Sequence, residues 1–377
     1  MSTLPTATPH DPAPSSPPAP AHGRLDLPWV HRELTAVLNA FIDGKTSEAR
    51  RQGLPVDIPT VLGKFLASGG KRIRPTMCVL GWHAAGGTDS VQPAVRAGAS
   101  LEMFHAFCLI HDDVMDHSAT RRGQPTVHRA LATHHHHGRT VAAADALGES
   151  AAILAGDLAL IWSDELLYGP DSELSPAHRE CVRPLVNVMR SEVMYGQYLD
   201  LTATGRPTTD VERALAIARY KTAKYTIERP LHIGAALAGA GREMLDALSA
   251  YALPLGEAFQ LRDDILGTFG DPAETGKPRL DDLRQGKHTV LLALALQRAD
   301  SAECEALHAL VGDPRLDEDA AARIRHIITA TGARAAVEDM IRVRREQAGR
   351  ALLTVPVAPA VEQSLQEFAD AVTGRTT

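Results

Sequence analysis

Two aspartate clusters, each at the end of a long and largely apolar stretch, limit most strongly how this chain can fold. Residues 112–116 read Asp-Asp-Val-Met-Asp after the run 101–110, and residues 263–267 read Asp-Asp-Ile-Leu-Gly after the run 253–261. Both runs must bury their apolar side chains, so their acids should emerge at the rim of a core. Because buried carboxylates without partners are costly, several of them at one rim would require cations.

The spacing of the first cluster favours a metal site. In a helix, Asp112 and Asp116 lie one turn apart on the same face, so both carboxylates can reach one ion. Neither thiolates nor clustered imidazoles stand beside them. Carboxylates alone suit a hard cation such as Mg²⁺, which fills its remaining positions with water and phosphate oxygens. We therefore expect a substrate that carries phosphate, although a single acidic triplet would more often be a solvated helix face.

Composition excludes several classes of protein. The formal net charge of −7 argues against a nucleic-acid-binding surface, which needs a basic stripe. No stretch of 18 uncharged apolar residues occurs, so no membrane span is expected. Four scattered cysteines without CxxC spacing indicate reduced, buried thiols and a cytoplasmic location.

The chain is expected to be all-α, with helices over most of its length. Aromatic residues make up only 4 % of the chain, and sustained alternation of apolar and polar residues is absent. Expected helices cover about 29–44, 57–67, 75–85, 90–116, 141–168, 174–201, 208–224, 229–240, 243–269, 288–298, 316–331, 333–353 and 358–373.

We expect one domain over residues 26–377 after a leader over residues 1–25. The leader is rich in Pro and Ala and has neither a basic start nor a long apolar run, which indicates disorder and not a signal peptide. After residue 25, nothing resembling a linker divides the chain.

Two basic segments could hold phosphate. Residues 69–75 read Gly-Gly-Lys-Arg-Ile-Arg-Pro, where glycines allow close backbone approach and the cations can clamp a diphosphate. Arg121 and Arg122 follow the first aspartate cluster, where arginine beside excess acid suits a site that holds Mg²⁺ and phosphate together. A basic surface turn and a plain ion-pair network remain open as the alternatives.

Two further segments are less specific. The polar residues 269–278, followed by 281–287, could form a lid over bound phosphate, although an ordinary surface connection would look the same. His134 to His137 cannot all point at one ion from a helix, and no acid or cysteine follows at zinc spacing. We therefore expect a solvated loop or helix end there, with only adventitious binding of nickel or zinc.

In combination, these motifs resemble the trans-isoprenyl diphosphate synthases, also called polyprenyl synthetases. The resemblance covers residues 30–373. It rests on GGKRIRP at 69–75, HDDVMDHSATRRGQP at 111–125, GDLAL at 156–160, KT at 221–222, FQLRDDILG at 259–267, TGKP at 275–278 and DDLRQGKHT at 281–289. It implies an all-α fold with a deep cavity and head-to-tail condensation of isopentenyl diphosphate with an allylic diphosphate.

The resemblance also implies roles for single residues. The Mg²⁺ ions, about three by resemblance, would be bound by Asp112, Asp116 and Asp263 with support from Asp113 and Asp264. The allylic diphosphate would be bound by Arg121, Lys221 and Lys277, with Gln260 beside the ionising group. Isopentenyl diphosphate would be held by Lys71, Arg74, His105 and Arg122.

One position departs from the common family pattern. Many members carry a third aspartate where this chain has Gly267, although a subgroup shares the DDxxG form. Asp271 is the one candidate in the sequence to compensate.

Product length is expected to depend on Phe104, Phe107 and Cys108, which lie within two turns before Asp112. An aromatic residue at position 107 stops the chain at short products in the family. The absence of an insertion in the first cluster favours geranylgeranyl diphosphate, with farnesyl diphosphate as the alternative. Ordinary core packing of Phe107 would look the same.

Two other functions must be weighed. Class I terpene cyclases pair one aspartate cluster with an Asn/Ser/Glu triad and lack the basic 69–75 segment, which this chain has. Non-catalytic subunits of the family usually lose aspartates or the basic segment, whereas here only position 267 departs. The resemblance also implies a homodimer.

Overall fold

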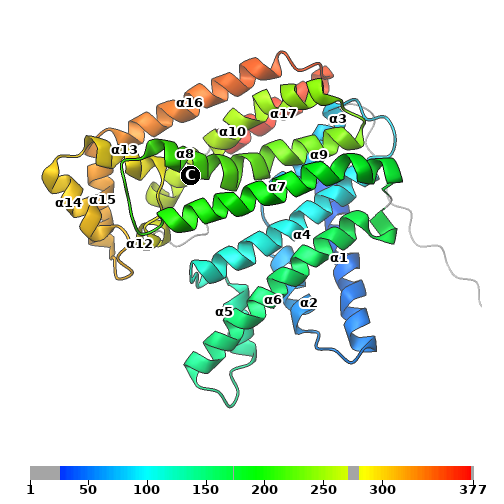
Figure 1. The fold of residues 1–377 in the computed structure, drawn as a ribbon, viewed down its shortest axis with the longest axis horizontal. Helices are drawn as coiled ribbons and strands as arrows, with labels where there is room; N and C mark the ends of the chain where they lie inside the picture. The colour runs from blue at the N-terminus through cyan, green and yellow to red at the C-terminus, as the bar shows by residue number, and fades with distance from the viewer. Residues whose placement is uncertain (1–25, 173, 271–279, 375–377) are drawn as a thin grey trace, which may run out of the picture.

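The computed structural model describes residues 26–172, 174–270 and 280–374, which form a bundle of helices (Figure 1). The α-helices are α1 Leu27–Arg51, α2 Asp57–Ala67, α3 Ile73–Ala84, α4 Gln92–Met115, α5 Val127–His134, α6 Val141–Tyr168, α7 Pro176–Ala203, α8 Val211–Ile217, α9 Arg229–Leu237, α10 Arg242–Phe269, α12 Asp281–Gln285, α13 Val290–Arg298, α14 Ser301–Leu310, α15 Glu318–Ala330, α16 Ala333–Leu352 and α17 Pro359–Thr373. A short 3₁₀ helix, η1, covers Pro170–Ser172, and a π-helix, η2, covers Ala218–Glu228.

The all-α expectation is confirmed, and most helix bounds lie within a few residues of those expected. Helices α5, α12 and α14 were not expected, and neither was the small antiparallel pair β1 Thr120–Arg121 and β2 Gln124–Pro125. The helix expected over 208–224 is confirmed for α8, but it was wrong in kind after Ile217, where α8 gives way to the π-helix η2. Apolar periodicity alone does not distinguish a π-helix from an α-helix over so short a span.

Helix α4 is the central element of one hydrophobic core. It is buried on nearly all sides, and α6 packs along it while α1, α7 and α9 surround it. Other cores join α10 with α16 and α17, and α13 with α15 and α16. Burial of α4 and α10 brings the ends of these two helices, and so both aspartate clusters, to one cavity.

In the part of the chain that the structure describes, no helix combines the length and the apolar character needed to cross a membrane. All four cysteines are free thiols. Their expected burial holds for Cys78 and in part for Cys108 and Cys304, but it was wrong for Cys181, which is exposed on α7. The leader lies outside the described residues.

Candidate active site

A cavity of about 710 Å³ opens between α4, α7, η2 and α10, and most of the predicted site residues line it. The lining residues that were predicted are Lys71, Arg74, His105, Phe107, Cys108, Asp112, Arg121, Arg122, Lys221, Gln260, Asp263 and Asp264. Lys277 and Asp271 lie outside the described residues. A cavity of this volume is within the usual range for small-molecule sites.

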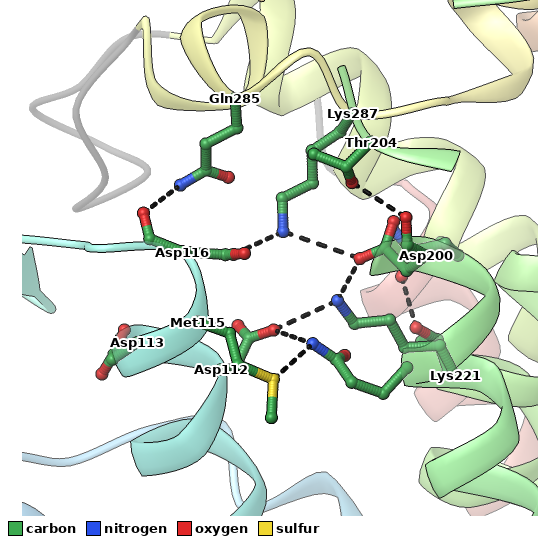
Figure 2. A network of polar contacts seen from close by, with 12 residues as sticks. Asp112, Asp113, Met115, Asp116, Asp200, Thr204, Lys221, Gln285 and Lys287 are labelled. Carbon is green, nitrogen blue, oxygen red and sulfur yellow. Dashed lines mark hydrogen bonds and ion pairs between the residues drawn. The ribbon is translucent and has the colours of Figure 1, made fainter. Parts of the chain in front are cut away.

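The first aspartate cluster ends α4 in a network of ion pairs (Figure 2). Asp112 Oδ1 accepts from Lys221 Nζ at 3.2 Å and from Gln197 Nε2 at 3.1 Å. Asp116 Oδ2 accepts from Lys287 Nζ at 2.6 Å. The two carboxylates thus face the same space, as their one-turn spacing predicted.

Asp200 of α7 completes this network, and the sequence reasoning missed it. Its carboxylate accepts from Lys221 Nζ at 2.5 Å and lies 3.7 Å from Lys287 Nζ. Lys287 lies in the segment 281–289, but the resemblance implied no role for it. In the structure it bridges Asp116 and Asp200 (Figure 2). The available signal was weak: Asp200 is an acid on the buried stripe of α7 that includes Val193 and Gly196.

Two glycines position the π-helix that carries Lys221. A Cβ on Gly196 of α7 would lie 2.3 Å from the backbone nitrogen of Lys221, and a Cβ on Gly256 of α10 would lie 2.6 Å from Cα of Ala223. The backbone of η2 therefore lies directly against both helices. Single π-turns are frequent at functional sites, and here the wider turn presents Lys221, Thr222 and Tyr225 to the cavity.

The lysines set the ionisation of the first cluster. Burial by itself would raise the pKa of Asp112, but Lys221, Lys287 and Arg121 more than offset it and hold the pKa below its usual range. Burial raises the pKa of Asp116, despite Lys287, and Asp112 adds to that shift. Burial would lower the pKa of Lys287, but the surrounding carboxylates raise it well above its usual value. The lysines thus occupy space between acids where other cations could also bind.

Asp113 and Arg121 form a separate pair. Arg121 Nε donates to Asp113 Oδ1 at 2.8 Å, and Arg121 lies 3.2 Å from Asp112 Oδ2. Asp113 is buried and points away from the lysine network (Figure 2). Its carboxylate therefore holds Arg121 at the rim of the cavity.

The second cluster faces the first across the cavity. Gln260 donates to Asp264 Oδ1 at 2.7 Å, and Thr222 donates to Gln260 Oε1 at 2.6 Å. Burial raises the pKa of Asp264 to about 7, with Asp282, Asp263 and Asp200 adding to the rise and Gln260 opposing it. Several carboxylates thus line this side of the cavity, with few cations beside them.

Asp282 fills the space beside Gly267. A Cβ built on Gly267 would lie 2.0 Å from Oδ2 of Asp282, so the Asp282 carboxylate stands where a side chain at position 267 would project. Asp282 also lines the cavity. Where many family members carry a third aspartate and this chain has Gly267, the carboxylate of Asp282 therefore lies in the same place.

The basic segment 69–75 lines the other side of the cavity. Arg74 lies over the ring of Tyr225 at 4.1 Å and donates to Thr226 Oγ1 at 2.7 Å. Arg72 differs from the other cations because it pairs with buried Glu102 at 2.9 Å. Lys71 lies 5.8 Å over the ring of Phe259. Two of the cations, Lys71 and Arg74, are thus presented to the cavity with aromatic faces beneath them.

Arg122 and His105 complete the basic side. Arg122 donates to the carbonyl oxygen of Gly69, and a Cβ on Gly70 would lie 2.6 Å from its Nη2, so only glycine fits at position 70 without displacing it. His105 Nδ1 lies 3.2 Å from the hydroxyl of Tyr225. Burial, with Arg74 and Arg122 nearby, keeps the pKa of His105 well below its usual value, so this imidazole is neutral.

The predicted length-determining residues form an apolar part of the wall. Phe107 and Cys108 line the cavity, whereas Phe104 is buried behind them, with its ring 5.4 Å from that of Phe107. Burial raises the pKa of Cys108 to about 12, so it is a neutral, apolar contact.

The chemistry of the donors fits magnesium. Asp112, Asp200, Asp263, Asp264 and Asp282 bring oxygen ligands to the cavity, and Asp116 joins them through Lys287, which also lies near Asp200. Cys108, the one cysteine of the described lining, is protonated. Carboxylates that exceed the neighbouring cations are the donor set that hard cations prefer.

Comparisons with known proteins agree with this geometry. The polyprenyl synthetase family model matches residues 57–328. A crystal structure of geranylgeranyl pyrophosphate synthase from Corynebacterium glutamicum, complexed with isoprenyl diphosphate and magnesium, superposes with a TM-score of 0.88 at 42 % identity over 93 % of this chain and 100 % of that chain.

Two curated relatives make different products. A geranylfarnesyl diphosphate synthase from Aeropyrum pernix is 34 % identical over 80 % of this chain and 88 % of its own length. A (2E,6E)-farnesyl diphosphate synthase from Mycobacterium bovis is 32 % identical over 81 % of this chain and 80 % of its own length. The relatives thus agree on the type of reaction and differ in product length.

Proposed function

We propose a product, and a role for each site residue, from the premise that this chain belongs to the polyprenyl synthetase family. It is a prenyltransferase whose substrates are prenyl diphosphates, and the family depends on magnesium. The proposed reaction is head-to-tail condensation of isopentenyl diphosphate with an allylic diphosphate. The observation that carries it is the single cavity with carboxylates on one side and Lys71, Arg74 and Arg122 on the other.

The acidic side would bind the allylic diphosphate. Asp112, Asp116, Asp200 and Asp263 would hold Mg²⁺, with Asp264 and Asp282 beside them. Since Mg²⁺ takes one or two protein carboxylates, these acids suffice for about three ions. When bound, Mg²⁺ stabilises negative charge on the departing diphosphate. Lys221 and Arg121 lie where they can donate to the same group, and Lys277 is proposed to do so by family resemblance.

The basic side would hold isopentenyl diphosphate. Lys71, Arg74 and Arg122 supply charge, and the neutral His105 can donate one hydrogen bond while its other nitrogen accepts from Tyr225. Arg72 is engaged by Glu102 and orders the segment instead.

The wall between the two sides would protect the reacting carbons. An allylic cation is quenched by water, and Phe107, Cys108 and Phe259 provide an apolar, weakly nucleophilic surface. Gln260 is held by Thr222 and Asp264, which directs its amide toward the same space.

Geranylgeranyl diphosphate is the proposed product, with farnesyl diphosphate as the second candidate. Phe107, which packs against Phe104, narrows the cavity below Asp112 and so favours short products. Incubation with Mg²⁺, labelled isopentenyl diphosphate and dimethylallyl, geranyl or farnesyl diphosphate should yield a linear C20 alcohol after dephosphorylation, and EDTA should abolish it. A C15 end product would overturn the assignment of length.

The same assay tests the other functions. A cyclic hydrocarbon formed without isopentenyl diphosphate would indicate a cyclase, and failure to extend every primer would indicate a non-catalytic subunit. Asp112→Ala and Asp263→Ala should abolish turnover while circular dichroism stays unchanged. Turnover retained by either variant would contradict the proposed metal ligands.

We also propose a homodimer. Helix α7 exposes Val188, Tyr195 and Tyr198 at helical spacing, to 44 %, 70 % and 63 %. Helix α6 exposes Ile153, Leu154 and Ile161, and Arg190 of α7 joins the two helices through Asp164 at 2.8 Å. Because large apolar side chains in such number are typical of interfaces, a second copy of the chain is the proposed partner.

A further inference from the structure

A cluster of possible metal ligands lies away from the cavity, at the junction of α2 and α5. Asp57 begins α2, His134 ends α5, and His135 follows it. His134 Nε2 lies 3.4 Å from Asp57 Oδ1, and His135 Nε2 lies 3.5 Å from Asp57 Oδ2. One ligand atom from each of the three residues lies within 4.8 Å of the others.

These separations suit an ion better than direct hydrogen bonds. Ligand atoms about 2.0–2.1 Å from a tetrahedral ion are about 3.4 Å apart, whereas N–H···O bonds cluster near 2.9–3.0 Å. The two imidazole rings meet edge to face, with centroids 4.7 Å apart, and each has its Nε2 near an oxygen of the same carboxylate. The side chains are 32 %, 61 % and 34 % exposed for Asp57, His134 and His135, which leaves access for an ion and for water ligands.

The four histidines lie at the end of α5 and in the turn after it and are mostly exposed, as the sequence predicted. They do not share one ion, because His136 Nδ1 contacts the carbonyl oxygen of Thr133 at 2.6 Å and its ring pairs with His137. The acid that sequence spacing lacked comes from Asp57, far away in the sequence but adjacent in the fold.

Imidazole nitrogen and carboxylate oxygen together select the metal class. Two nitrogens and one oxygen suit zinc and its neighbours nickel and cobalt, and not magnesium, which prefers oxygen alone. We propose that Asp57, His134 and His135 bind a zinc-type divalent cation that ties the start of α2 to the end of α5.

The location suggests what such a cation would do. The opposite end of α2 leads into the basic segment 69–75, and the opposite end of α5 follows the hairpin that carries Arg122. There, Arg122 donates to the carbonyl oxygen of Gly69 and joins the two segments. A cation at Asp57 would join the start of α2 to the end of α5. The two helices would then be linked at both ends, which would stabilise the basic side of the cavity.

The test uses the full chain in excess Mg²⁺, which occupies the carboxylates of the cavity. Zn²⁺ is titrated by calorimetry, and thermal unfolding is followed with and without Zn²⁺. One saturable site and an upward shift of a few degrees in Tm are expected. Asp57→Asn, and His134→Ala combined with His135→Ala, should each weaken binding about 10-fold or more and remove the shift.

His136→Ala combined with His137→Ala is the matched control, because it removes as many imidazoles from the same segment but leaves the cluster intact. It should bind Zn²⁺ as the wild type does. Equal loss in this control, or unchanged binding by Asp57→Asn, would show adventitious capture by the histidine run and would overturn the proposal. Absence of a saturable site in the wild type would also overturn it. None of these residues belongs to the cavity, so prenyltransferase activity in Mg²⁺ reports separately on the proposed function.

Discussion

At the scale of single residues, Gly267 and Asp282 show how one position can compensate for another. The second aspartate cluster lacks a third acid, yet the carboxylate of Asp282 stands where that acid would project. Asp271, the candidate that the sequence suggested, lies outside the described residues. We therefore propose that Asp282 supplies the carboxylate that the sequence lacks at position 267.

Asp282→Asn should lower kcat/KM and raise the Mg²⁺ concentration needed for half-maximal activity, each by about 10-fold or more, because it removes one charge from the acidic wall. Gly267→Asp alone should also impair activity, since its side chain collides with Asp282. The double variant Gly267→Asp/Asp282→Gly should recover most of the loss in a Mg²⁺ titration. An unchanged Mg²⁺ requirement in Asp282→Asn would refute this assignment.

Asp264 gives the metal-free protein a pH-dependent stability. Its pKa of about 7 in the folded state exceeds the ordinary value of 3.8, so the folded state binds the proton more tightly. This contribution is complete below about pH 4 and is lost as the pH rises through about 7, by up to about 4 kcal/mol.

In EDTA, Asp264→Asn should therefore match the wild type in free energy of unfolding below about pH 4, exceed it increasingly as the pH rises toward 7, and exceed it by the full amount near pH 8, as measured by urea denaturation. Asp43→Asn on the exposed face of α1 serves as the control and should leave the pH dependence unchanged. Parallel pH profiles for wild type and Asp264→Asn would contradict the raised pKa.

At the scale of elements, the π-helix η2 is the feature that periodicity did not reveal. Lys221, Thr222 and Tyr225 reach the cavity from this wider turn, which Gly196 and Gly256 allow to lie close against α7 and α10. The sequence around Gly196 and Gly256 does not reveal why glycine is needed there, because each makes room for the backbone of η2, a different part of the chain.

Gly196→Ala should destabilise the protein by about 1–3 kcal/mol, because the added methyl group meets the backbone of Lys221. Displaced from Asp112 and Asp200, Lys221 should also support less turnover, so kcat should fall together with stability. Gly349→Ala is the matched control: it lies within α16 with nothing close to its Cβ and should stabilise by about 0.5–1 kcal/mol. Urea unfolding and steady-state kinetics measure both effects, and a neutral Gly196→Ala would show that η2 can move freely.

At the scale of the whole molecule, the exposed apolar residues on α6 and α7 are the feature that calls for a partner. Their position on α7 is informative, because the opposite face of this helix carries Gln197 and Asp200. An interface along α7 would support the helix that completes the acidic site.

Val188→Glu combined with Tyr195→Glu should convert a dimer into monomers in sedimentation velocity, because two charges would be buried at the interface. Leu353→Glu, at an exposed residue at the end of α16, should leave the dimer intact. A wild-type protein that sediments as a monomer at micromolar concentration would refute the proposed assembly.

The sequence by itself determined the helical fold, the aspartate clusters at the ends of α4 and α10, and the basic segment 69–75. These follow from local periodicity and from residue types at short spacing, such as Asp112 and Asp116 one turn apart. Only the tertiary structure decided that Asp200 and Lys287 join that cluster, that Asp282 fills the space beside Gly267, and that Asp57 faces His134 and His135. Each of these depends on helices from distant parts of the chain packing together, and a charge finds such partners through space and not along the sequence.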